Sequence, residues 1–215
     1  MARVLTALIL TALFAHPASA GQPLTNVDTV AIDAGHGDDD PGSSRGDALE
    51  KMQCALVAQA LKGVIERENG PSVKIVFTFK PEGNTSQRER AYAANSNGAK
   101  VFVSIHGFPS WQPEAGIYIP APPDINPPSW KNTAGKFLAK SSQLAEKLKP
   151  ALDSSNPEKK HFVTFGQLRV FNGVTAPSVA VEAVALDPQH PLTPESAEKI
   201  ALAIYSGLVE FGKTP

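Results

Sequence analysis

Short apolar runs alternate with longer amphipathic segments along most of the chain. Runs rich in β-branched residues are typical of strands, and the first half of the chain contains three, at residues 27–32, 73–79 and 101–105. Similar runs predict three more strands, at residues 116–120, 167–171 and 178–184. The run at 101–105 is almost entirely apolar, which is expected of a strand covered on both faces. The pattern therefore predicts a sheet that is buried between two layers.

The amphipathic segments predict helices between these strands. Apolar residues recur at every fourth position through residues 48–68, which is the spacing of one helix face. Ser86 followed by Glu89 is the pattern of a capping box and predicts a helix to about residue 95. Thr193 is a suitable N-cap for a final helix. The last two predicted helices span residues 130–148 and 194–212.

This order of elements predicts the fold class. Strands that alternate with helices are typical of α/β proteins, in which the helices connect parallel strands across the sheet. We therefore expect a single α/β domain with a mostly parallel (mixed) β-sheet flanked by helices on both faces. Residues 121–128 are rich in proline and residues 154–161 are polar, so both are predicted to be loops.

The first twenty residues have the features of a signal peptide. Arg3 precedes a run of about a dozen mainly apolar residues, and Ala18-Ser19-Ala20 matches an A-x-A cleavage site. A buried N-terminal helix is the alternative interpretation. We expect residues 1–20 to be removed and residues 21–215 to form the folded, exported domain. This leader contains no cysteine and no second long apolar run follows it, so no membrane anchor is expected.

Composition excludes some classes of partner. The formal net charge is −1, and no dense cluster of lysine and arginine occurs, so nucleic acid is not expected as a partner. The apolar fraction of 42% and the charged fraction of 19% are typical of a globular domain. The single cysteine, Cys54, falls within a predicted helix and is expected to be a core residue.

Two histidines follow the ends of predicted strands. His36 lies in "DAGHG" after the first strand, and His106 directly follows the strand at 101–105. A single histidine in such a place is more often a structural residue, but two at matching strand ends can share a metal ion. Glu50, at the start of a helix, could be a third ligand or could simply complement the helix dipole.

A fourth ionisable residue lies in an apolar strand. Glu182 has apolar neighbours on both sides, in "PSVAVEAVAL". A carboxylate in such surroundings is paired, bound to a metal or raised in pKa, and a raised pKa suits a general base. The alternative is a residue of an edge strand that faces water. Near the histidines, Asp33 could orient an imidazole, whereas residues 38–40 are expected to form a solvated turn.

Several of these segments together resemble a known family. "VAIDAGHGDDDPG", "LEK", "RAYAANSNGAKVFVSIHG" and "PSVAVE" are similar to segments of the zinc-dependent N-acetylmuramoyl-L-alanine amidases of the Amidase_3 type, in the same order. The resemblance extends from residue 29 to about residue 212. It implies a mostly parallel sheet, one Zn²⁺ held by His36, Glu50 and His106, and Glu182 as the catalytic carboxylate. The implied reaction cuts the amide bond between N-acetylmuramic acid and L-alanine in peptidoglycan or a muropeptide.

The chain departs from the family pattern beside two of these residues. Gly107 replaces the usual alanine, and Ala183-Val184 replaces the usual Gly-Phe. Two alternatives therefore stay open: a catalytically weakened peptidoglycan-binding protein on the same fold, and a zinc amide hydrolase that acts on soluble wall fragments. Because no wall-binding repeats are present, we expect the periplasm rather than the extracellular space. We also expect a monomer.

Overall fold

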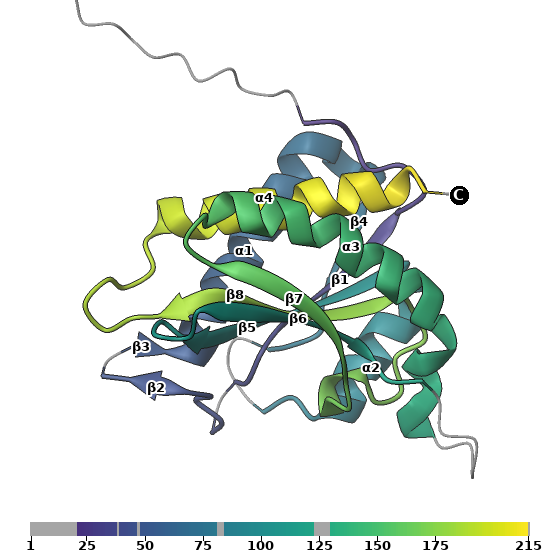
Figure 1. Ribbon diagram of the computed structural model, residues 1–215. Helices are drawn as coiled ribbons and strands as arrows, with labels where there is room; N and C mark the ends of the chain where they lie inside the picture. Colours follow the sequence, from purple (N-terminus) through teal and green to yellow (C-terminus); the bar gives the residue numbers. More distant parts are fainter. Residues whose placement is uncertain (1–20, 38, 47, 81–83, 123–129, 215) are drawn as a thin grey trace, which may run out of the picture.

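The computed structural model describes residues 21–37, 39–46, 48–80, 84–122 and 130–214. Within these ranges a six-stranded sheet forms the centre of the molecule, in the order β4-β1-β5-β8-β6-β7 (Figure 1). Its strands are β1 (Thr29–Ala34), β4 (Lys74–Phe77), β5 (Val101–Pro109), β6 (Glu114–Pro120), β7 (Lys160–Gly166) and β8 (Ser178–Leu186). The predicted signal peptide and most of the proline-rich loop lie outside the described residues.

The sheet is mixed, as the sequence predicts. Strands β4, β1, β5 and β8 run parallel to one another. Strand β6 is antiparallel to β8, and β7 is parallel to β6. The carboxyl ends of β1 and β5 therefore lie beside each other at one edge of the sheet, where ligands bind in open α/β folds.

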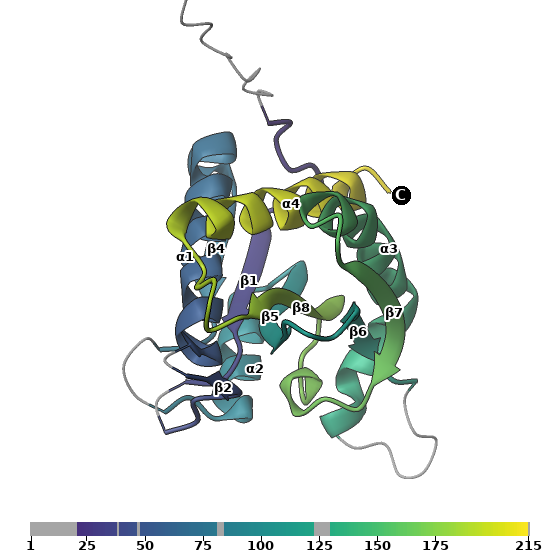
Figure 2. The same ribbon diagram turned by 60° about the vertical axis from the view of Figure 1, so that its left-hand side comes forward.

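Helices cover the two faces of the sheet unequally (Figures 1 and 2). One face carries α1 (Glu50–Asn69), α3 (Leu138–Ser155) and α4 (Pro194–Gly212), which enclose the larger hydrophobic cluster. The other face carries α2 (Gln87–Ser96) with the 3₁₀ turns η2 (Trp130–Phe137) and η3 (Arg169–Phe171), over a smaller cluster. The remaining elements are the turn η1 (Gly70–Ser72) and the hairpin of β2 (Ser44–Arg45) and β3 (Ala48–Leu49).

Two predicted helix starts are confirmed by their caps. The Glu89 backbone N–H donates to Ser86 Oγ (3.3 Å), and Glu89 Oε2 accepts from the Ser86 backbone N–H (2.8 Å), so the capping box begins α2. The Ser196 N–H donates to Thr193 Oγ1 (3.2 Å) at the start of α4. These bonds satisfy backbone donors that the first turn of a helix leaves without partners.

The second half of the chain differs from the prediction at three places. Residues 167–171 do not form a strand; part of this apolar run forms η3, because Val170 and Phe171 are buried in the smaller cluster. An edge strand that the sequence did not predict, β7, forms just before this run and includes the end of the predicted polar loop. Helix α3 begins later than predicted and continues past Pro150. Proline has no backbone N–H to donate within a helix, and Pro150 lies on the exposed side of α3.

Cys54 is fully buried in the larger cluster, as predicted. None of the helices in the described ranges is long and apolar enough to cross a membrane.

Candidate functional site

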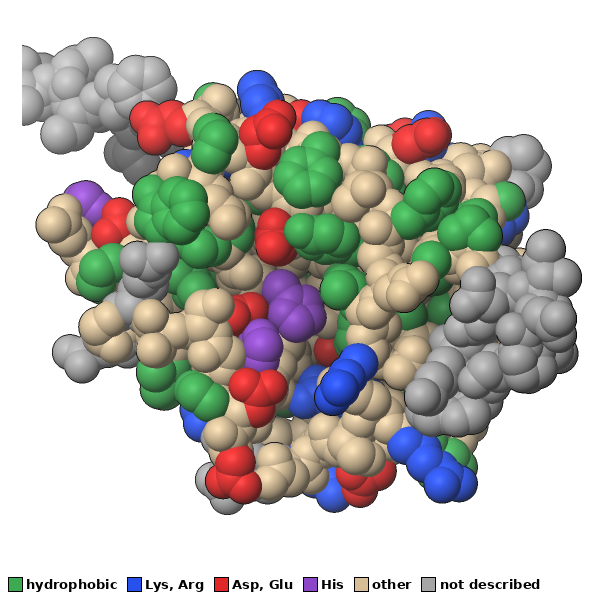
Figure 3. All heavy atoms as spheres, turned by 60° about the horizontal axis from the view of Figure 1, so that its bottom comes forward, with side chains coloured by type: hydrophobic (Ala, Val, Ile, Leu, Met, Phe, Trp, Pro, Cys, Tyr) green, Lys and Arg blue, Asp and Glu red, His purple; other side chains and the backbone are tan. Residues whose placement is uncertain are grey.

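His36, Glu50 and His106 converge at one edge of the sheet. His36 lies in the loop after β1, His106 lies in β5, and Glu50 is the first residue of α1. One ligand atom from each of these residues lies within 4.8 Å of the others. Figure 3 shows two adjacent histidine side chains in a hollow of this face, with carboxylates beside them. The structure thus brings together the three residues that the sequence singles out as metal ligands.

Both imidazole rings face one carboxylate oxygen. His36 Nε2 lies 3.0 Å from Glu50 Oε1, and His106 Nδ1 lies 3.3 Å from the same oxygen. Glu50 is only 3% exposed. Backbone N–H groups of Gly107 and Ser43 donate to its two oxygens, each at 2.9 Å. Glu50 is therefore a buried group aimed at two imidazoles, not an exposed first-turn residue that only complements the helix dipole.

The charges of His36 and Glu50 depend strongly on each other. The hydrogen bond with Glu50 raises the pKa of His36 to about 9. Burial alone would raise the pKa of Glu50, but hydrogen bonds from the two histidines and two backbone N–H groups hold that pKa well below its usual range. Glu50 is therefore ionised and His36 protonated at neutral pH when no metal is bound.

The loop that carries His36 is held in an unusual backbone conformation. His36 has a φ of 66°, in the left-handed region, and Gly42 has a φ of 68°. A Cβ atom at Gly42 would lie 2.5 Å from Cδ2 of His36 and 2.8 Å from Oε2 of Glu50. Only glycine can therefore fill this position without moving the site.

Asp40 orients the His36 ring. Its Oδ2 lies 2.9 Å from Nδ1 of His36, and its Oδ1 accepts from the Gly42 N–H at 3.0 Å. Asp40 lies in the exposed turn that the sequence predicts, with 67% of its side chain exposed, and it also contacts the His36 ring, which the sequence did not indicate. A carboxylate on one ring nitrogen fixes the imidazole and leaves the other nitrogen, Nε2, directed at Glu50.

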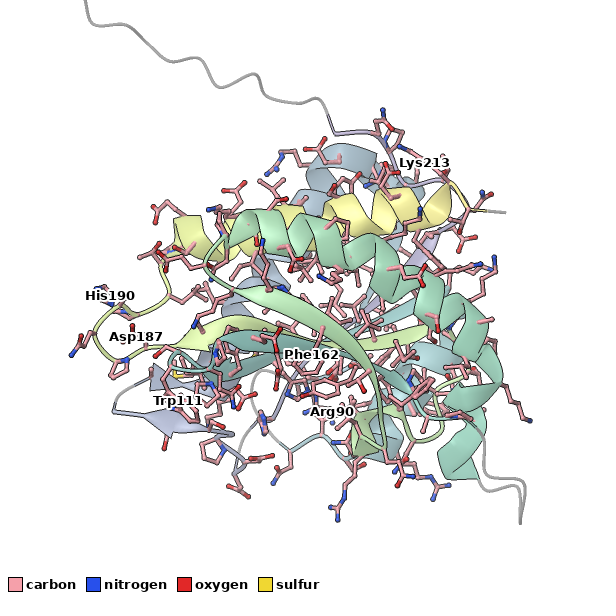
Figure 4. The ribbon with its side chains drawn as sticks, viewed as in Figure 1. Arg90, Trp111, Phe162, Asp187, His190 and Lys213 are labelled. Carbon is pink, nitrogen blue, oxygen red and sulfur yellow. The ribbon has the colours of Figure 1, made fainter. Side chains whose placement is uncertain are left out.

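Asp33 has a different role from the one that the sequence suggests. It is completely buried and contacts the hydroxyls of Thr78 and Ser104, the latter at 2.7 Å, rather than an imidazole. Its charge is balanced by Arg90, whose Nη1 lies 2.7 Å from Asp33 Oδ1. The same guanidinium donates to the carbonyl oxygens of Ala34 and His36. In Figure 4, Arg90 lies beneath the sheet, on the α2 side.

Arg90, held by its ion pair with Asp33, therefore fixes the backbone at Ala34 and at His36, where the loop after β1 begins. Sequence reasoning missed Arg90, because a charged residue in the first turns of a short helix gives no sign of a buried partner elsewhere in the chain.

Glu182 lies beside the trio. It is paired with His106 across β5 and β8, and β8 is an interior strand, so the edge-strand alternative is wrong. The Gly116 N–H donates to Glu182 Oε2 at 2.6 Å, and the Tyr118 hydroxyl hydrogen-bonds the same carboxylate. Burial raises the pKa of Glu182 above its ordinary value, as suits a general base.

These groups share one cleft. A cavity of about 460 Å³ is lined by His36, Glu50, His106 and Glu182, together with residues of α2, β6 and the segment around η3. Tyr118 forms part of its apolar wall and packs edge-on against Phe162 of β7, which is labelled in Figure 4. Two imidazoles, a carboxylate and a separate carboxylic base in one cleft can support metal-assisted hydrolysis.

The departure from the family pattern at Gly107 has a local physical reason. A Cβ atom there would lie 3.0 Å from the Leu186 side chain and 3.1 Å from Cγ of Glu50. Alanine would therefore crowd the carboxylate that faces both histidines. Glycine keeps the backbone N–H in place as a donor to Glu50.

Curated relatives are similar to part of the chain. A segment of 77 residues is 34% identical to the sporulation-specific N-acetylmuramoyl-L-alanine amidase of Bacillus subtilis, and covers 36% of this chain and 30% of that protein. A segment of 88 residues is 35% identical to the probable N-acetylmuramoyl-L-alanine amidase AmiB of Haemophilus influenzae, and covers 40% and 20%, respectively. The matches thus span less than a third of the length of these relatives.

Solved structures share the fold over most of the chain. The catalytic domain of CwlV from Bacillus (Paenibacillus) polymyxa var. colistinus has a TM-score of 0.69 at 21% identity, covering 86% of this chain and 98% of that one. AmiC2 of Nostoc punctiforme has a TM-score of 0.67, also at 21% identity, covering 85% and 96%. The Amidase_3 family model, described as N-acetylmuramoyl-L-alanine amidase, matches residues 30–210, so the chain belongs to this family.

Proposed function

We propose that this protein is a peptidoglycan hydrolase that cuts the amide bond between the lactyl group of N-acetylmuramic acid and the L-alanine of the stem peptide. Membership of the amidase family supports the type of bond. One observation carries the proposal for this chain: His36, Glu50 and His106 converge within 4.8 Å, in the same cleft as Glu182. A general base beside a candidate metal site is the arrangement that metal-assisted hydrolysis of an amide uses.

We further propose that these three residues hold one zinc ion. Two imidazole nitrogens and one carboxylate oxygen are a donor set that zinc takes in catalytic sites. The fit is supported by the buried Glu50 carboxylate, which two backbone N–H groups hold in place, and by Asp40, which orients His36. A zinc ion held in this way supplies Lewis acidity, which polarises an amide carbonyl and lowers the pKa of a water molecule.

Glu182 is the catalytic carboxylate in this proposal. Its carboxylate takes a proton from the attacking water and passes it to the amide nitrogen, which leaves as the amino group of L-alanine. The Gly116 N–H fixes one oxygen of Glu182, so the carboxylate keeps its orientation while it exchanges the proton. Its raised pKa lies closer to neutral pH than the pKa of an exposed glutamate, which suits a group that accepts and donates a proton at neutral pH.

The proposal extends to location and state. Residues 1–20 act as a signal peptide that exports the chain, and the periplasm is its proposed site of action. The names of the curated relatives, which are amidases of N-acetylmuramoyl-L-alanine, support a substrate outside the cytoplasm. The substrate is peptidoglycan or a muropeptide, and the protein acts as a monomer without a membrane anchor.

Zinc content and peptidoglycan digestion, measured on the same samples, test the function. Purified protein should hold about one zinc per chain and release free stem peptides, detected by mass spectrometry. His106→Ala should lose both properties, whereas Glu182→Gln should keep the metal and lose turnover. His190→Ala is the matched control, because the His190 side chain is 82% exposed and lies outside the cleft.

Each alternative gives a different result in this experiment. A protein that sediments with peptidoglycan but releases no stem peptide would be a binding protein on the amidase fold. A protein that cuts soluble muropeptides but leaves intact peptidoglycan unchanged would be an amide hydrolase of wall fragments. Either result would overturn the proposed substrate.

A further inference from the structure

The candidate cleft has a cationic side that the proposed chemistry does not use. Two arginines line the cleft, Arg90 and Arg169. The guanidinium of Arg90 is committed to Asp33 and to backbone carbonyls. The side chain of Arg169 is exposed and forms no hydrogen bond or ion pair with any residue in the described ranges. In Figure 3 a lysine or arginine side chain stands across the hollow from the two histidines.

The backbone beneath Arg169 is firmly anchored. Val170 and Phe171 are buried, at 7% and 3% exposure, and the Asn172 N–H donates to the Arg169 carbonyl at 3.0 Å. The next turn is tied to α2, because Asn95 Nδ2 donates to the Gly173 carbonyl at 2.8 Å. A free cationic head on a rigid base loses little backbone entropy when it binds a ligand, which is typical of a recognition residue.

A second polar group in the cleft also has no partner. Gln87 Oε1 is buried and accepts no hydrogen bond within the described part of the chain. Gln87 lines the same cavity as Arg169. A buried acceptor without a donor is costly, so a ligand that supplies an N–H group there would relieve that cost.

We propose that Arg169 binds a carboxylate of the stem peptide and that Gln87 Oε1 accepts a peptide N–H, so that this wall recognises the leaving peptide. The inference rests on the proposed function. It follows from where the substrate carries charge. The lactyl carboxyl group is consumed in the amide bond that is cut, and the sugar is neutral, so the negative groups lie on the peptide. A guanidinium matches the geometry of a carboxylate with two parallel hydrogen bonds.

The test compares two soluble substrates that differ only in charge. One is an N-acetylmuramoyl peptide with free carboxylates, and the other is the same peptide with those carboxylates converted to amides. For the zinc-loaded wild type, kcat/KM should favour the free carboxylates by about tenfold, as expected for one charge-assisted hydrogen-bonded pair. Arg169→Ala should remove this preference, mainly through KM, and Arg169→Lys should keep part of it.

Two further variants separate recognition from folding. Arg88→Ala is the matched control, because Arg88 is exposed on α2 and lies outside the cleft lining, and it should keep the full preference. Gln87→Ala should lower kcat/KM for both substrates by a similar factor, since an N–H group is present in each. The wild-type preference should shrink as salt is added, because salt screens a charge pair at the rim of a cleft.

The results distinguish this inference from the function beneath it. Equal cleavage of both substrates by the wild type, or a preference that survives in Arg169→Ala, would overturn the inference and leave the amidase activity standing. Cleavage of neither substrate by the zinc-loaded wild type would overturn the proposed function, and the inference with it.

Discussion

Replacing Arg90 by methionine removes the cation that faces Asp33 beneath the site. Both side chains are almost inaccessible, at 5% exposure for Arg90 and 1% for Asp33, and their closest atoms are 2.7 Å apart. The variant leaves a buried carboxylate with only two hydroxyl partners. Removing one partner of a buried pair typically costs about 3–5 kcal/mol. In a domain of this size each kcal/mol lowers the melting temperature by about 2–4 °C, so a drop of roughly 6–20 °C is expected.

The same variant should also weaken the metal site. Arg90 donates to the carbonyl oxygens of Ala34 and His36, so its loss releases the loop that presents one imidazole. We expect zinc affinity to fall by about 10–100-fold, as for the loss of groups that support metal ligands. Thermal unfolding of the metal-free protein and competitive zinc titration measure the two effects separately.

A double variant sharpens this test. Asp33→Asn combined with Arg90→Met leaves no buried charge, so its free energy of unfolding should exceed the value expected from adding the two single losses, by about 0.5–3 kcal/mol. Arg88→Met, at an exposed position on the same helix, should change stability by no more than about 0.5 kcal/mol. A loss below about 1 kcal/mol in Arg90→Met, or strict additivity in the double variant, would refute the role assigned to this pair.

Three further predictions concern the chemistry of the site. Glu182→Gln should lower kcat by about 10²–10⁴-fold with unchanged zinc content, and near-normal turnover would exclude it as the general base. Asp40→Asn should weaken zinc binding by about 10–100-fold, measured by competitive titration, since Asp40 orients His36; unchanged affinity would show that this contact is not needed. Because the pKa of His36 is raised to about 9 in the metal-free protein, it carries a proton at pH 7 that zinc must displace. Calorimetry of zinc binding in buffers of different ionisation enthalpy should therefore detect the release of this proton at pH 7, and the release should disappear as the pH rises through about 9. A His36→Ala variant that releases as many protons as the wild type would contradict the assignment.

Elements whose ends are marked by a short local sequence pattern could be predicted from the sequence. The capping box at Ser86 and the cap at Thr193 act within a single turn, so their sequence patterns are sufficient to locate the starts of α2 and α4. Strand β7 was not predicted. It lies at the edge of the sheet, and its exposed Phe162 and Phe165 interrupt the alternation of apolar and polar residues that marks a strand. The run at 167–171 is apolar because η3 anchors the smaller cluster, and local periodicity does not distinguish that from a strand.

The same distinction applies to the site: residues placed by the strand order can be predicted, and residues placed by long-range contacts cannot. The proximity of His36 and His106 follows from topology, since each lies near the carboxyl end of one of two neighbouring parallel strands. The partners of Arg90 and the free head of Arg169 depend on contacts between segments far apart in the chain. No pattern within a short window contains that information, so these residues emerge only from the folded structure.

Anomalous diffraction at the zinc edge, on crystals of the zinc-loaded protein, tests the central claim most directly. We predict one strong peak within bonding reach of His36 Nε2, a Glu50 carboxylate oxygen and His106 Nδ1, retained in Glu182→Gln and absent in His106→Ala. A peak bound by other side chains, or a His106→Ala variant that keeps the peak in the same place, would contradict the metal centre on which the proposed hydrolysis depends.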